Sequence, residues 1–299
     1  MTGERKGELY ILAESALWSF FPVITTLSYA NLPSILALAW SSLFSAVFFG
    51  CIVAYHGTWG EMRNPALWRE LVGVMLFIGV LFYVFYFIGL ETTTAGNAAL
   101  IGQVEILTSF IFFHLIRREA VTMEHVFGAV LMGVGAFFVL THNFSGFHPG
   151  DFFILAAVSV APLGNFFQQR ARKIASSATI MFARTVCASA IIFFLAWLMG
   201  KHASSEDVRH GLTFLLIYGF LLLGLSKILW IEAIHQISVT KANALNGFTP
   251  LLTLLVAWVV LDQQPNLLQL LSLPFLLVGV LLLTGVWSWK RNAHSRSTA

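Results

Sequence analysis

The sequence predicts an all-α polytopic membrane protein, with ten transmembrane helices arranged as two inverted five-helix repeats. Hydrophobic residues make up 58% of the 299 residues, charged residues make up 10%, and the mean hydropathy is +0.82. The apolar residues come in ten blocks, each close to the ~20 residues that cross a bilayer core of ~30 Å. Since the connections between the blocks are short, any chemistry must take place inside the helix bundle or at its ends.

Polar and turn-forming residues separate consecutive spans. Ser28–Asn31 precede Pro33, and Asp262–Pro265 follow the ninth apolar block. The charged residues around Lys6 precede a full-length block without a small-residue cleavage site, which favours a retained first helix over a signal peptide. In chain order, we expect spans at roughly Gly7–Leu27, Leu32–Tyr55, Leu67–Leu90, Thr94–Ile116, Thr122–Leu140, Gly150–Gln169, Ala178–Gly200, Gly211–Ile234, Thr240–Leu261 and Leu267–Trp287.

Lysine and arginine gather on one side of these spans. With the N-terminus inside, thirteen of the seventeen lie on the inner side and two, Lys201 and Arg209, on the outer side. Because cytoplasmic loops carry the excess of positive charge, we expect both termini in the cytoplasm and a multi-pass protein of the bacterial inner (plasma) membrane. The excess of lysine and arginine therefore reflects the orientation of the protein in the membrane. No exposed basic domain that would bind nucleic acid is expected.

The second half of the chain echoes the first at an offset of about 144 residues. Ala98 falls on Ala242 and Leu107 on Leu251, and span lengths and polar positions repeat in the same order. Five spans in each half is an odd number, so the two repeats must have opposite orientations in the membrane. We expect repeats at residues 1–145 and 146–299, with a substrate site near the midplane where they meet.

Three stretches carry a family resemblance: Ile11-Leu-Ala-Glu-Ser-Ala-Leu-Trp18, Gly89-Leu-Glu-Thr-Thr-Thr-Ala-Gly-Asn-Ala-Ala99 and Ala242-Asn-Ala-Leu-Asn-Gly-Phe-Thr-Pro250. With them the chain resembles the drug/metabolite transporter superfamily, in particular its ten-helix EamA-type permeases. The resemblance implies transport of small organic molecules, often their export. In that family the fourth helix of each half often carries a central proline. Pro250 fits, whereas Ile106 stands at the matching first-half position, so the two halves need not bend alike.

Two carboxylates lie at membrane depth, where a charge costs ~2.5–3.5 kcal/mol on insertion scales. Glu105 is central in the fourth span, on one helical face with Asn97. Glu14 is two turns into the first span, within Leu12-Ala-Glu14, which looks like the first helix of the small multidrug resistance subfamily, where a glutamate binds protons and cationic drugs. Each could bind substrate or protons, or serve as a structural acid that hydrogen-bonds a neighbouring helix.

Two basic residues also fall within spans. Lys227 could bind substrate, with Trp230 flanking a ligand, or extend its long stem towards the cytoplasm. Arg184 is close to the inner end of its span, where contact with lipid headgroups is the favoured interpretation. Amides and aromatic rings on several spans argue for a polar, aromatic-lined cavity. The expected substrate-binding residues are Glu14, Trp18, Tyr83, Tyr86, Asn97, Glu105, Asn165, Lys227, Trp230, Asn243 and Asn246.

The fifth and tenth spans look like scaffold. They are poor in polar residues and carry small residues, which let membrane helices approach closely. We expect them to pack together away from the cavity, through Gly133, Gly135 and Gly279.

These features favour a secondary transporter of a small organic metabolite, such as an amino acid or another zwitterion, over other classes. No Walker-type loop or cofactor motif is present, so an ion gradient, with proton coupling as one option, or the substrate's own gradient would supply the energy. Efflux of cationic drugs is the alternative. An intramembrane enzyme is disfavoured because HExxH and GxSxG motifs are absent, and a sensor because no output domain is evident. The sequence leaves the oligomeric state open.

Overall fold

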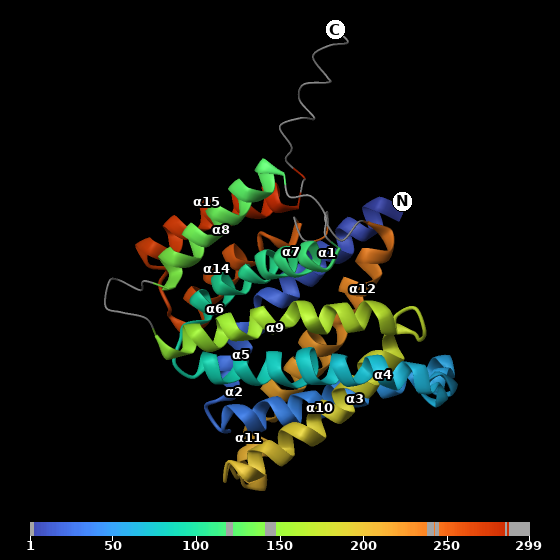
Figure 1. The fold of residues 1–299 in the computed structure, drawn as a ribbon. Helices are drawn as coiled ribbons and strands as arrows, with labels where there is room; N and C mark the ends of the chain where they lie inside the picture. Colours follow the sequence, from blue (N-terminus) through green and yellow to red (C-terminus); the bar gives the residue numbers. More distant parts are fainter. Residues whose placement is uncertain are drawn as a thin grey trace.

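The structure, a computed structural model, describes residues 3–117, 122–140, 148–237, 242, 245–284 and 286. Within these residues it is a bundle of helices without strands, and Figure 1 shows them running alongside one another. Eight helical stretches are long and apolar enough to cross a membrane, and two shorter apolar helices complete the ten predicted spans. The all-helical, polytopic prediction is confirmed.

The first half contains five spans. The helices are α1 (Gly3–Ser19) with α2 (Phe21–Ser28); α3 (Ser34–His56); α4 (Pro65–Gly73), η2 (Val74–Leu81) and α5 (Phe82–Leu90); α6 (Ala95–Gly102) with α7 (Val104–Arg117); and α8 (Met123–Leu140). A short 3₁₀ helix, η1 (Thr58–Arg63), connects the second span to the third.

The second half repeats this order. Its helices are α9 (Pro149–Ala171); α10 (Ser177–Leu198); α11 (Ser205–Leu216), η4 (Ile217–Leu225) and α12 (Ser226–Gln236); α14 (Thr249–Leu261); and α15 (Leu267–Leu283). Most boundaries lie within a few residues of the predicted ones. Helix α11 starts earlier than expected because Ser204 and Asp207 form a capping box there, each side chain bonding the other's backbone N–H.

The inverted repeat is visible in the helix geometry. The segments η2 and η4 are both π-helical, and their last residues, Leu81 and Leu225, are 144 positions apart. The close helix contacts repeat as well. A Cβ on Gly150 would lie 2.3 Å from the Gly89 carbonyl oxygen where α9 meets α5, and one on Gly7 would lie 3.3 Å from the Ala233 oxygen where α1 meets α12.

The fourth span breaks at Gln103 although it lacks a proline. The Gln103 N–H donates to the Leu100 oxygen at 3.1 Å, and the Ile106 N–H to the Gln103 oxygen at 3.0 Å, so the hydrogen bonds tighten to a 3₁₀ pattern there. The ninth span breaks at the corresponding place, just before α14, where Pro250 supplies no N–H. Both halves therefore bend at matching positions, although the missing proline left that open.

Helices α8 and α15 pack side by side at one edge of the bundle, as predicted for the fifth and tenth spans (Figure 1). A Cβ on Gly279 would lie 2.5 Å from Met132 Cγ and 2.9 Å from the Gly128 oxygen, and one on Gly135 would lie 2.7 Å from Leu276 Cγ. Gly133, in contrast, faces open space, so its expected role in this contact is wrong.

Candidate functional site

A cavity of about 870 Å³ lies between the two repeats. Eight of the ten spans line it, and α3 and α8 contribute no residue among those described. The exposed residues Gln169 and Lys173, at the end of α9, belong to its lining, so the cavity reaches the surface at that end of the bundle. The last turn of α15 also reaches it through Leu283, a small departure from the expectation that the tenth span lies away from it.

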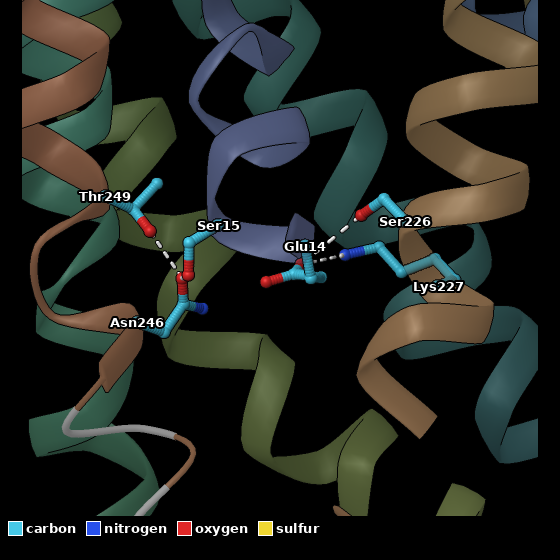
Figure 2. A network of polar contacts seen from close by, with 6 residues as sticks. All are labelled: Glu14, Ser15, Ser226, Lys227, Asn246 and Thr249. Atoms are coloured by element: carbon cyan, nitrogen blue, oxygen red, sulfur yellow. Dashed lines mark hydrogen bonds and ion pairs between the residues drawn. The ribbon is translucent and has the colours of Figure 1, made fainter. Parts of the chain in front are cut away.

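Glu14 and Lys227 meet across the repeat boundary within this cavity. Lys227 Nζ of α12 lies 3.8 Å from Glu14 Oε1 of α1, and the Ser226 hydroxyl donates to the same oxygen at 3.3 Å (Figure 2). The ammonium also sits 3.2 Å from the centroid of the Trp18 ring, a close cation–π contact. Each charge therefore finds its counterpart inside the protein, which offsets the cost of burying it.

Asn246 forms a second polar group on the other side of α1. Its side-chain oxygen accepts from Ser15 Oγ at 2.8 Å and also from the Thr249 hydroxyl (Figure 2). These bonds tie α1 to the bend that begins α14. Asn246 lines the cavity together with Thr249, so this bend presents polar groups to a ligand.

Glu105 faces the cavity from α7 and has a neutral partner. The Asn165 side-chain N–H of α9 donates to Glu105 Oε1 at 3.2 Å. Among the described residues, no lysine or arginine lies within salt-bridge distance of it. Among the residues that the structure describes, the Glu105 carboxylate is thus held by the Asn165 amide, at a place where a ligand can reach it.

Aromatic rings form one wall of the cavity. Trp18 stacks on Phe21 with ring centroids 4.2 Å apart, and Phe21 meets Tyr86 edge to face at 4.8 Å. Tyr83 and Tyr86 follow on α5, each 5% exposed, and Trp230 adds a ring from α12. A wall of this kind suits the apolar or aromatic part of a small ligand.

Arg184 also lines the cavity, contrary to the headgroup contact expected from its place near the end of a span. It is 3% exposed, and its Cζ lies 5.8 Å from the centroid of the Tyr83 ring. The signal that could have revealed this is the small or polar character of Thr185, Ala188 and Ser189, since a lipid-facing surface would carry larger apolar side chains. All three are buried.

A family model identifies this architecture. The model of the EamA-like transporter family matches the chain twice, over residues 5–141 and over residues 148–285. These two stretches correspond to the two five-span repeats. The chain belongs to the EamA-like transporter family. It is a multi-pass membrane protein of that family.

Similar proteins carry the same broad description. An uncharacterized transporter of Methanothermobacter thermautotrophicus is 28% identical over 213 residues, covering 67% of this chain and 57% of that protein. One of Synechocystis sp. is 21% identical over 208 residues, covering 66% and 59%. The chain thus spans less than two thirds of the length of these relatives. A solved crystal structure at 16% identity superposes with a TM-score of 0.68 over 95% of this chain and 98% of its own, which supports the fold.

Nine of the eleven residues that the sequence predicted to bind substrate line the cavity. The other two are Asn97 and Asn243. Asn97 is 1% exposed and accepts from Gln269 Nε2 at 2.6 Å, near the end of the bundle opposite the mouth. The break at Gln103 alters the helical phase between Asn97 and Glu105, so regular spacing placed them on one face wrongly. Asn243 lies outside the described residues.

Polar contacts close the end of the bundle opposite the cavity mouth. Ser34 donates to Glu91, Thr93 donates to Asp151, and the Ala95 N–H donates to Gln263 Oε1 at 3.1 Å. The last two of these cross between the repeats. In this conformation the EamA-like transporter is therefore packed at one end and accessible at the other.

Proposed function

We propose that this chain is a secondary transporter which exports a small zwitterionic metabolite, such as an amino acid, across the plasma membrane. The observation that carries the proposal is the chemistry of the central cavity. It presents Glu105, whose hydrogen-bond partner in the described part of the chain is the Asn165 amide, together with the basic residues Lys227 and Arg184 and an aromatic wall. A ligand with a positive group, a negative group and an apolar part would satisfy all three features.

The conformation supports export. The cavity reaches the surface beside Arg172 and Lys173, and the positive-inside rule assigns that end to the cytoplasm together with both termini. An exporter loads its substrate from that side. Proton exchange at Glu105 is the proposed energy source, because a carboxyl lining a membrane cavity can alternate between binding a proton and binding an ammonium group.

Efflux of lipophilic cations is a weaker candidate. Its support is Glu14 near the cavity, but Lys227 already neutralises that carboxylate. Four basic side chains and two acidic ones line the described cavity, an excess that repels a simple cation. A molecule that also carries a negative group fits this lining better.

Reconstituted flux tests the proposal. The twenty standard amino acids are screened for thermal stabilisation of the purified full-length protein, and those that stabilise it are measured as radiolabelled flux into proteoliposomes with an imposed proton gradient. We expect saturable, gradient-dependent flux of at least one amino acid, and none in protein-free liposomes. Ethidium is measured in parallel. Transport of ethidium without transport of any amino acid would replace the proposed function by cation efflux.

A further inference from the structure

Arg184 is a buried cation without an acidic partner. Its exposed fraction is 3%, and no carboxylate of the described part of the chain lies within salt-bridge distance of it. Its described contact is with the Tyr83 ring, whose centroid is 5.8 Å from Cζ. Buried charges in proteins are normally paired, since an uncompensated charge in a membrane bundle is costly. Arg184 therefore leaves room for an anion that the described part of the chain does not supply.

Lys227 is a poorer anion receptor than Arg184. Its ammonium already contacts the Glu14 carboxylate at 3.8 Å and covers the Trp18 ring at 3.2 Å. A negative group of a ligand would have to displace Glu14, which is itself buried and would then lack a counter-charge. The Glu14–Lys227 pair is best regarded as an internal, mutually neutralising contact.

The Arg184 side chain is held by the opposite repeat. Gly79 of η2 lies against its stem, where a Cβ would come within 3.2 Å of Arg184 Cγ. Tyr83, four residues further along the same span, faces its guanidinium. A planar guanidinium held in this way presents paired N–H donors, which match the two oxygens of a carboxylate.

We propose that Arg184 determines substrate specificity by binding a carboxylate group of the transported molecule, with Tyr83 beside it, while Glu105, which lines the same cavity, binds the cationic group. This inference rests on the proposed function for the identity of the molecule. The surrounding charge agrees with it, because Arg172 and Lys173 at the mouth add positive charge along the route to Arg184.

Removal of a single ligand charge tests the assignment. The amino acid with the best flux is compared with its primary amide, which keeps the ammonium group and loses the negative charge. Binding of both is measured calorimetrically to full-length wild type, Arg184→Gln, Arg184→Lys and Lys227→Gln. We expect wild type to prefer the amino acid by about 10- to 100-fold, the range for a hydrogen-bonded charge. Arg184→Gln should lose that preference and leave the affinity for the amide unchanged.

The other two variants are matched controls. Lys227→Gln should change the affinities for both ligands by a similar factor and keep the preference. Arg184→Lys retains the charge without the paired donors, so an intermediate preference is expected, and it serves as the test if Arg184→Gln does not fold. Retention of the full preference in a folded Arg184 variant, or its loss in Lys227→Gln, overturns the assignment.

A second measurement does not depend on the amino acid proposal. Phenylglyoxal modifies arginine side chains, and mass spectrometry follows Arg184 and Arg172 separately in the wild-type protein. Benzoate should slow modification of Arg184 several-fold, whereas benzylamine should not. If no amino acid is transported and benzoate still protects, the proposed substrate class fails while the anion site stands. If an amino acid is transported and neither benzoate nor that amino acid protects Arg184, the anion site fails alone.

Discussion

Lys227 places its ammonium between the Glu14 carboxylate, 3.8 Å away, and the face of Trp18, 3.2 Å from the ring centroid. The two charges belong to different repeats, so this contact joins α1 to α12 beside the cavity. Glu14 is 1% exposed, whereas the Lys227 side chain is 17% exposed towards the cavity. The pair is therefore one-sided, with a fully buried acid and a base that a ligand can approach.

Loss of one partner of this pair should destabilise the protein more than loss of both charges. We expect Glu14→Gln or Lys227→Met alone to lower the free energy of unfolding by about 1–3 kcal/mol, because an uncompensated charge stays behind. The double variant should be more stable than the sum of the single effects predicts, by about 1 kcal/mol. Thermal unfolding in detergent checks this, with the exposed Glu206→Gln as control. Strict additivity would show that the two charges are not coupled.

The contact between α8 and α15 gives a prediction with a control in the same pair of helices. A Cβ on Gly279 would meet Met132 Cγ at 2.5 Å, whereas one on Gly133 meets nothing within 4 Å. Gly279→Ala should therefore cost about 1–3 kcal/mol of stability through overpacking. Gly133→Ala should be neutral or stabilising by up to about 1 kcal/mol, since alanine favours the helix. Both should bind substrate with wild-type affinity, since neither glycine belongs to the described lining of the cavity.

The sequence predicted the spans because each must bury its own backbone hydrogen bonds in about twenty apolar residues, which is a local requirement. The helical phase of residues on the two sides of a bend, in contrast, does not follow from the local sequence. Asn97 and Glu105 share a face only if the helix runs on unbroken, and Gln103 interrupts it without a proline to announce the break. Asn97 instead bonds Gln269, a partner 172 residues away that no spacing rule could supply.

Arg184 shows that the surroundings of a charged side chain are equally hard to predict from the local sequence. A long cationic side chain near the end of a span can reach the headgroups in any isolated helix, so the sequence favours that interpretation. The outcome depended on which face of α10 the bundle buries. Gly79 of the other repeat accommodates the stem of Arg184, and this fit exists only once the repeats are packed.

Glu61 links the two repeats outside the membrane and gives a pH prediction. Its Oε2 accepts from Ser176 N and Oγ, both at 2.8 Å, at the start of α10. Burial acts to raise the pKa of the Glu61 carboxyl, but hydrogen bonds from Thr179 and Ser176 and the charge of Arg172 outweigh it, leaving the pKa below its ordinary 4.5. A lowered pKa stabilises the folded state above that ordinary value, and the contribution is lost as pH falls through the folded-state pKa.

Glu61→Gln should therefore melt below wild type at neutral pH. The gap should shrink steadily below pH 4.5, the ordinary value, as the wild-type carboxyl takes up its proton. Melting temperatures of both proteins across this range check the prediction, with Glu206→Gln again as control. A gap that does not change with pH would mean that the carboxylate charge contributes nothing to this contact.

Cysteine labelling tests the orientation in the membrane. In a background with Cys51 and Cys187 replaced by alanine, single cysteines at His148 or Lys201 should react with an impermeant maleimide added outside intact cells. Cysteines at Arg63 or Lys173 should react only after permeabilisation, because the distribution of basic residues places them inside. The reverse pattern would invert the topology and turn the accessible mouth towards the outside.

Glu105 supports the last prediction, which concerns the mechanism. Its carboxylate is held by Asn165 at 3.2 Å and faces the cavity, so Glu105→Gln keeps the shape and a hydrogen-bonding side chain while removing the negative charge. If Glu105 binds the ammonium group of the substrate or exchanges protons with it, this variant should fold normally and lose most of its proton-driven flux. The residual flux should no longer vary with pH. Flux in proteoliposomes at several pH values measures both effects.

Asn165→Ala is the matched control, because it keeps the Glu105 charge and removes the hydrogen bond to it. This variant should retain pH-dependent flux at a reduced rate. Near-normal flux with an unchanged pH profile in Glu105→Gln would make Glu105 a structural acid and leave Arg184 as the charge that meets the substrate.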